Sequence, residues 1–156
     1  IWRLGDTYIT SIGQYGTQVT PINVVRYIAA IANKGKLLKP TILLGEERNP
    51  VVKILNFKEG DWKIVQEGMR ESVTYGTSVG LNVPYVDAAG KTGTAEIGSG
   101  KSYVHSWSVG FFPYEHPKYA WAVIMEKGPA TNTVGATSVM RQVFDWISVY
   151  SPQYFQ

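Results

Sequence analysis

The tetrapeptide Lys91-Thr92-Gly93-Thr94 combines residue types that can bind a substrate carboxylate at the edge of a strand. A lysine ammonium and threonine hydroxyls can bind a carboxylate through charge and hydrogen bonds. The glycine between them lets a ligand lie against the strand backbone, because no Cβ stands in the way. We therefore expect Lys91, Thr92, Gly93 and Thr94 to form a substrate-binding edge.

The motifs on both sides of this tetrapeptide support a functional role for it. Average residue usage produces a chance Lys-Thr-Gly in a chain this long about a few per cent of the time, and exposed lysine is the usual case. Taken alone, Lys91 therefore fits a surface lysine equally well. Further motifs, however, stand on both sides of it in chain order: Gly5-Asp6-Thr7, Ile12-Gly13-Gln14, Val19-Thr20-Pro21, Asn33-Lys34-Gly35, Gly76-Thr77-Ser78, His105-Ser106-Trp107 and Gly110-Phe111-Phe112-Pro113.

In this order and spacing the motifs resemble the C-terminal part of the transpeptidase domain of class B penicillin-binding proteins. The lead Gly5-Asp6-Thr7 and Ile12-Gly13-Gln14 is most similar to the elongation type, penicillin-binding protein 2. The resemblance covers the chain from about Trp2 to Ile147. One departure is Gln14-Tyr15-Gly16, where relatives commonly read Gln-Gly-Tyr, so the geometry of that turn is not carried over.

The resemblance assigns roles to the motif residues. It implies that Lys91 binds the substrate carboxylate region and supports proton transfer, and that the hydroxyls of Thr92 and Thr94 help to bind the carboxylate. It also implies that the backbone N–H of Thr94 is one of two oxyanion-hole donors. Such donors commonly contribute a few kcal/mol to the lowering of the barrier. Gly93 completes the substrate-binding strand.

Two other motifs of the family are absent from the chain. No serine is followed three residues later by lysine, and the nearest match ends in Arg141, which cannot act as a base at neutral pH. No serine has asparagine two residues on, and the chain starts at Ile1 without a methionine. We interpret residues 1–156 as the C-terminal part of one transpeptidase domain whose N-terminal part, with the nucleophile, is missing. By itself this part is expected to be inactive.

The resemblance implies a peptidoglycan D,D-transpeptidase that cross-links stem peptides through a serine acyl-enzyme and is inhibited by β-lactams. No metal or organic cofactor is implied. The implied location is the periplasmic face of the bacterial inner membrane, with an anchor outside this sequence. The implied partners are the missing N-terminal part, an elongation-type glycosyltransferase and an elongation scaffold protein.

Two alternative classes share the Lys-Thr-Gly motif. A penicillin-sensing receptor domain would bind without cross-linking, but the block from Ile12 to Gly35 is typical of transpeptidases. A D,D-carboxypeptidase or a β-lactamase would hydrolyse instead of transferring, but neither usually carries the helix that Thr20-Pro21 opens.

Composition limits the remaining possibilities. With 44% apolar residues, 17% charged residues and a net charge of +3, the chain suits one domain with a core. Its basic residues form no run that would indicate nucleic-acid binding. The only histidines are His105 and His116, and cysteine is absent, so we expect no metal site and a structural hydrogen bond for His105. We expect Trp107 to belong to the core, with a ligand groove lined by Tyr15, Tyr103 and Trp107 as the alternative.

The pattern predicts an α+β fold in which helices flank an antiparallel sheet. The resemblance implies that this is the C-terminal portion of the penicillin-binding protein/β-lactamase-like transpeptidase fold. Strands are expected at residues 89–97, 103–112 and 119–127, joined by short turns. The third strand is apolar on both alternating sets, so both of its faces need cover. We expect the sheet to be incomplete, with the N-terminal part of the domain covering its edge or faces.

Three helices are expected around this sheet. The first begins at Pro21 behind the N-cap Thr20 and ends before Gly35. It is apolar around most of its girth, so we expect it to be buried around most of its girth. A short strand and an exposed connection at 45–50 follow within residues 41–57. The inner faces expected for the other two helices are Trp62, Val65, Met69 and Val73 for the helix at 59–73, and Val139, Met140, Val143, Phe144 and Ile147 for the helix at 134–150.

Overall fold

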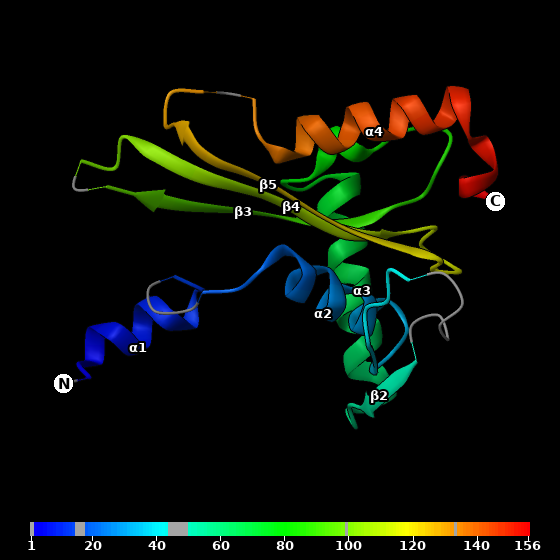
Figure 1. The fold of residues 1–156 in the computed structure, drawn as a ribbon, viewed down its shortest axis with the longest axis horizontal. Coiled ribbons are helices and arrows are strands. Elements are labelled where there is room, and N and C mark those ends of the chain that lie inside the picture. Colours follow the sequence, from blue (N-terminus) through cyan, green and yellow to red (C-terminus); the bar gives the residue numbers. More distant parts are fainter. Residues whose placement is uncertain (1, 15–17, 44–49, 99, 133) are drawn as a thin grey trace.

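The computed structural model describes residues 2–14, 18–43, 50–98, 100–132 and 134–156. Its centre is an antiparallel sheet in the order β3-β4-β5, formed by Ala89–Ile97, Tyr103–Phe112 and Tyr119–Pro129. The three predicted strands are confirmed, and the third continues to Pro129. Helix α4 covers one face of this sheet and helix α2 the other (Figure 1). The predicted α+β class with an antiparallel sheet is therefore correct.

Helix α2 spans Pro21–Ala32, as predicted. The Thr20 hydroxyl oxygen accepts a hydrogen bond from the backbone N–H of Asn23 at 3.4 Å, which caps the first turn. After the helix, Gly35 has a φ of +102°, and a Cβ at this position would lie 2.6 Å from the carbonyl oxygen of Leu55. Glycine is thus required here both for its backbone conformation and for space.

The prediction that α2 is buried around most of its girth is wrong. Only Val24, Ile28 and Ala30 are buried, whereas Ile22 is 51% exposed. The reason is that α2 packs on the sheet along one side, and the described residues leave Ile22 exposed and Val25 only partly buried. The apolar pattern of α2 therefore predicts more burial than the described residues provide.

Helix α3 spans Glu59–Thr74, one residue beyond the predicted end. Met69 and Val73 are buried as expected, but Val65 is 44% exposed, so its predicted inward position is wrong. Gln66 faces inward instead, and its side-chain amide donates to the carbonyl oxygens of Ile31 at 2.8 Å and Ala32 at 3.1 Å. The last carbonyls of α2 lack partners within their own helix, so a donor next to them is favourable.

Helix α1 and strand β1 were not predicted. Helix α1 spans Leu4–Ser11 and buries no residue; the Asp6 carboxylate accepts a hydrogen bond from the backbone N–H of Arg3 at 2.8 Å. Strand β1 (Lys36–Leu38) pairs antiparallel with β2 (Val51–Ile54), which is the short strand expected within residues 41–57. Nearly all of the connection expected at 45–50 lies outside the described residues.

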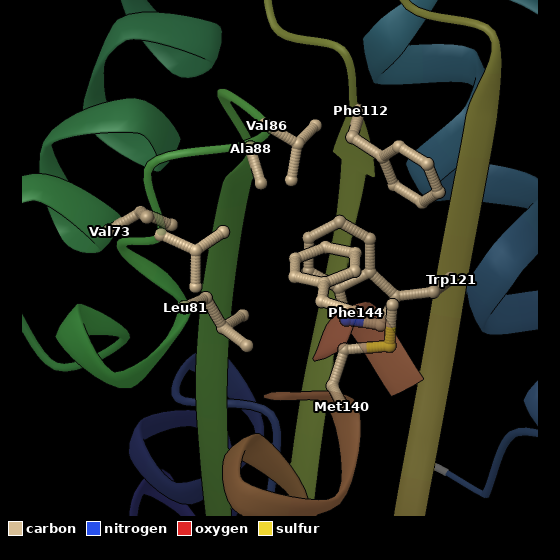
Figure 2. Close-up of a cluster of buried hydrophobic side chains, with 9 residues drawn as sticks. Val73, Leu81, Val86, Ala88, Phe112, Trp121, Met140 and Phe144 are labelled. Atoms are coloured by element: carbon tan, nitrogen blue, oxygen red, sulfur yellow. The ribbon is translucent and has the colours of Figure 1, made fainter. Parts of the chain in front are cut away.

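Helix α4 spans Ala136–Tyr150 and packs on the sheet through Met140 and Phe144, as predicted. The Phe144 ring meets those of Phe112 and Trp121 edge to face, at centroid distances of 5.1 and 5.5 Å (Figure 2). The inward placement predicted for Val143 is wrong, because its side chain is 40% exposed. The cluster on this face contains Val73, Leu81, Val83, Val86, Ala88, Phe112, Trp121, Met140 and Phe144.

A second cluster fills the opposite face, between the sheet, α2 and α3. It consists of Val24, Ile28, Met69, Ala89, Val109 and Phe111, with Ala120 and Ala122 of β5 packed against it. Strand β5 therefore packs on both faces, as its doubly apolar pattern predicts. The short helices η1 (Val79–Leu81) and η2 (Pro152–Phe155) complete the described elements.

Candidate active site

The Lys-Thr-Gly motif lies on β3, an edge strand whose only sheet neighbour among the described residues is β4. Lys91 stands opposite Val109, and Thr92 stands opposite Ser108. Because successive side chains of a strand point to opposite faces, Lys91 shares the α2 face with Val109, and Thr92 shares the α4 face with Ser108. The motif therefore presents groups on both sides of a free strand edge.

A groove of about 580 Å³ runs along this edge. Lys91, Thr92 and Gly93 line it together, so the structure brings three of the four predicted site residues to one cavity. Its walls are Gly13, Gln18, Val19, Val24, Tyr27, Lys91, Thr92, Gly93, Ala95, His105, Trp107, Val109, Ile124 and Glu126. Partial burial at this wall raises the pKa of the Tyr27 hydroxyl above its ordinary value.

Trp107 stands opposite Gly93 and takes part in both the groove and the core. A Cβ at Gly93 would lie 3.4 Å from the Cβ of Trp107, so a larger residue would narrow the groove. Trp107 is half-buried and packs against the cluster on the α2 face, but it also lines the groove, so the assignment to the core alone is incomplete. Tyr103 is 50% exposed and is not part of the groove wall, and Tyr15 lies outside the described residues.

The polar groups of the motif form a short chain. The Lys91 ammonium donates to the carbonyl oxygen of Thr92 at 2.8 Å, and its nitrogen lies 3.5 Å from the Thr92 hydroxyl oxygen. The Thr92 hydroxyl donates to the hydroxyl oxygen of Thr77 at 2.8 Å. Thr77 thus joins the site from the loop after α3, although sequence reasoning gave it no role.

Thr94 lies apart from this groove. It lines a second cavity of about 250 Å³, together with Ser106 and Gly135. The Ser106 hydroxyl oxygen accepts a hydrogen bond from the backbone N–H of Ala136 at 2.9 Å, which anchors the start of α4 next to the motif. Lys91 and Thr94, three residues apart on the strand, thus border different cavities.

His105 has the structural hydrogen bond that the sequence predicts. Its Nδ1 accepts from the backbone N–H of Lys127 at 3.2 Å, where the β4–β5 register shifts between Val104 and Ser106. His116 is exposed in the turn after β4. In the part of the chain that the structure describes, no group of three histidine, aspartate or glutamate residues is arranged to hold a metal ion.

The family is decided by comparison with known proteins. The family model of the penicillin-binding protein transpeptidase domain matches residues 2–145. The chain belongs to this family. A peptidoglycan D,D-transpeptidase MrdA of Acinetobacter baumannii is 31% identical over 93% of this chain and 25% of its own length. The chain spans about a quarter of the length of the curated relatives it matches.

Solved structures agree with this assignment. A penicillin-binding protein 2 of Helicobacter pylori, determined alone and in complex with MreC, has a TM-score of 0.79 and 29% identity over 96% of this chain and 28% of that chain. Penicillin-binding protein A of Mycobacterium tuberculosis, solved as an imipenem acyl-enzyme complex, has a TM-score of 0.69 and 29% identity over 88% of this chain and 32% of that chain.

The resemblance drawn from the motifs is therefore confirmed. The chain is a transpeptidase-domain segment of the class B, penicillin-binding protein 2 type. Among the helices of the described residues, none combines the length and the apolar character that crossing a bilayer requires.

Proposed function

We propose that the protein is a peptidoglycan D,D-transpeptidase and that this chain provides the Lys-Thr-Gly wall of its active site. The observation that supports this most directly is the groove on the free edge of β3, where Lys91, Thr92 and Gly93 converge. Relatives named peptidoglycan D,D-transpeptidase support the same reaction.

The proposed reaction proceeds through a covalent acyl-enzyme. A serine hydroxyl outside residues 1–156 attacks the carbonyl carbon of the penultimate D-alanine in a stem peptide. The peptide bond to the terminal D-alanine breaks, and that residue leaves as a free amino acid after its nitrogen gains a proton. An amine of a neighbouring stem peptide then attacks the ester carbonyl, forms the cross-link and releases the serine with its proton restored.

The motif residues act on the carboxylate and on the developing oxyanion. Lys91 attracts the terminal carboxylate of the donor peptide by charge, and the hydroxyls of Thr92 and Thr94 donate to it. The backbone N–H of Thr94 is one of two donors to the oxyanion. Gly93, opposite Trp107, keeps the strand surface low enough for an extended peptide to lie along the free edge.

The remainder of the domain comes from other residues of the protein. The side of α2 that carries Ile22 and Val25 borders an open cavity of about 400 Å³, and the relatives are about four times as long as this chain. A preceding segment that bears the nucleophile would cover this apolar side as it completes the site. The same segment would connect to a membrane anchor that holds the domain at the periplasmic face of the inner membrane.

β-Lactams and an elongation complex complete the proposed function. A β-lactam carries a carboxylate and an acylating carbonyl, so it would acylate the same serine; the imipenem acyl-enzyme of the Mycobacterium tuberculosis relative supports this. The Helicobacter pylori relative in complex with MreC supports an elongation scaffold partner, and an elongation-type glycosyltransferase would supply glycan strands. The chemistry requires only the nucleophile, proton-transfer groups and oxyanion donors, so no metal or organic cofactor is proposed.

The substitution Lys91→Ala in the full-length protein tests this assignment. Its rate of acylation by a fluorescent penicillin should fall at least about tenfold, which corresponds to about 1.4 kcal/mol of lost transition-state stabilisation. The thermal unfolding midpoint should stay unchanged, because the Lys91 side chain is exposed and packs little.

Lys101→Ala is the matched control, since Lys101 lies in the turn after β3 and pairs with Glu96 at 2.7 Å, outside the groove. Its acylation rate should equal that of the wild type. Equal rates for Lys91→Ala and the wild type, with unchanged stability, would show that the motif assignment is wrong.

A further inference from the structure

The loop after α3 holds Thr77 in a fixed position beside the motif. The backbone N–H of Gly76 donates to the carbonyl oxygen of Glu71 at 3.1 Å, and that of Ser78 donates to the carbonyl oxygen of Ser72 at 2.9 Å. Both neighbours of Thr77 are thus tied to the last turns of α3. A Cβ at Gly76 would lie 2.8 Å from the Cα of Ser72, so the loop also packs closely against the helix.

A buried contact strengthens this anchor. Ser78 is 1% exposed, and the Ser72 hydroxyl donates to its hydroxyl oxygen at 3.0 Å. Burial of a hydroxyl is favourable only with a partner, so this pair fixes the loop against α3. Thr77, in contrast, is exposed, and its hydroxyl oxygen accepts the hydrogen bond that the Thr92 hydroxyl donates.

We infer that Thr77 is a positioning residue of the carboxylate-binding site, which acts by holding the hydroxyl of Thr92; this inference rests on the proposed function. The two hydroxyl oxygens lie 2.8 Å apart. Each hydroxyl has one proton to donate and two lone pairs that accept. When a substrate carboxylate reaches the motif, the Thr92 proton turns to the carboxylate and the Thr77 proton turns to the Thr92 oxygen.

This reversal has an energetic consequence. A Thr92 hydroxyl that accepts a hydrogen bond while it donates to a carboxylate is a stronger donor, because hydrogen bonds in a chain polarise one another. The contact with Thr77 also restrains the Thr92 side chain before a ligand binds, so less conformational freedom is lost on binding. Removal of the Thr77 hydroxyl should therefore weaken the recognition of carboxylates and leave the acylation chemistry itself intact.

The test compares two β-lactams on the full-length protein: benzylpenicillin, which has a free carboxylate, and its methyl ester, which has none. Thr77→Val replaces the hydroxyl with a methyl group of similar size. It should lower the second-order rate of acylation by benzylpenicillin about threefold to tenfold, the range that one hydrogen bond supports. The rate for the ester should change by less than about twofold, because the ester cannot use the carboxylate site as an anion.

Two further variants make the result specific. Thr77→Ser keeps the hydroxyl and should restore the wild-type ratio of the two rates. Thr74→Val makes the same chemical change nearby and should leave both rates unchanged, because the Thr74 hydroxyl donates to the α3 carbonyls of Arg70 and Glu71 and not to the motif. The ratio of the two rates is independent of the fraction of folded protein, so a partly unfolded variant still gives an answer.

Three outcomes would overturn the inference. A Thr77→Val variant with wild-type rates, or with equal losses for both β-lactams, would show that the Thr77–Thr92 bond has no role in carboxylate recognition. Failure of Thr77→Ser to restore the ratio would exclude the hydroxyl as the cause. Wild-type protein that neither β-lactam acylates would overturn the proposed function as well, which separates the two failures.

Discussion

At the scale of residues, Asp145 lies outside the groove and has two hydrogen-bond donors that stabilise its ionised form. Its carboxylate accepts hydrogen bonds from the Tyr85 hydroxyl and from the Arg141 guanidinium, whose Nε lies 3.0 Å from Oδ1. These two partners, the tyrosine first, hold the pKa of Asp145 below its ordinary value of 3.8. Arg141 also donates to the carbonyl oxygen of Gly80 at 3.1 Å, so the cluster links α4 to η1.

The sign of the resulting pH dependence follows from the direction of this shift. A carboxyl whose folded pKa is depressed stabilises the fold above its unfolded pKa, and this contribution is lost as pH falls through the folded value. Asp145→Asn removes the contribution at all pH values. We therefore expect the variant to be less stable than the wild type at pH 5, and the difference in urea midpoint to shrink below about pH 3.8. A difference that stays constant down to pH 2.5 would contradict this assignment.

Sequence reasoning identified the motif residues but not their partner Thr77. Lys91, Thr92 and Gly93 were recognisable because their residue types and order are typical of a carboxylate-binding strand. The Thr77 hydroxyl belongs to a residue 15 positions earlier, and its approach to Thr92 depends on the end of α3 and on the path of the loop. Polar pairs of this kind depend on tertiary geometry that no local pattern encodes.

At the scale of elements, the close packing of the sheet on the α4 face can be tested at Gly110. This residue stands opposite both Gly90 and Trp121, and a Cβ here would lie 2.2 Å from the carbonyl oxygen of Ala89 and 2.3 Å from the Trp121 ring. Gly110→Ala should destabilise the domain by at least about 2 kcal/mol, because neither backbone nor a buried indole can yield easily. Calorimetry of the full-length protein would show this as a lower unfolding midpoint.

Gly68→Ala is the matched control, since nothing lies within 4 Å of a Cβ built at this position in α3. Alanine in an exposed helix interior should stabilise the domain by about 0.5–1 kcal/mol. The two glycine substitutions should therefore change the stability of the domain in opposite directions. A wild-type midpoint for Gly110→Ala would contradict the packing described for the β3–β4 pair.

The major elements could be predicted because their signals are local. Thr20-Pro21 and Gly35 mark the ends of α2, and the alternating or doubly apolar runs mark the strands of the sheet. Val65 and Gln66 are both close to the helix face that carries Met69, and Val65 was placed inward because it is apolar. The inward position of Gln66 depends on its hydrogen bonds to the carbonyl oxygens at the end of α2, which the sequence pattern does not show. Helix α1 was missed because it has only eight residues, fewer than the window over which helical periodicity can be read.

At the scale of the whole molecule, much apolar surface has no partner among the described residues. Trp146, Val149 and Tyr150 on the outer side of α4 are 56%, 69% and 68% exposed. Large contiguous apolar patches are uncommon on monomeric proteins. Together with the length of the relatives, this surface supports the proposal that other residues of the protein complete the domain.

Mapping of a penicillin adduct tests the central claim most directly. The account predicts that residues 1–156 alone, incubated with a penicillin, stay unmodified by mass, since no serine here is followed three residues later by lysine. In the full-length protein it predicts one stoichiometric adduct, located by peptide mapping on a serine outside these residues that has such a lysine. A stoichiometric adduct on a serine within residues 1–156, or no adduct on the full-length protein, would contradict the account.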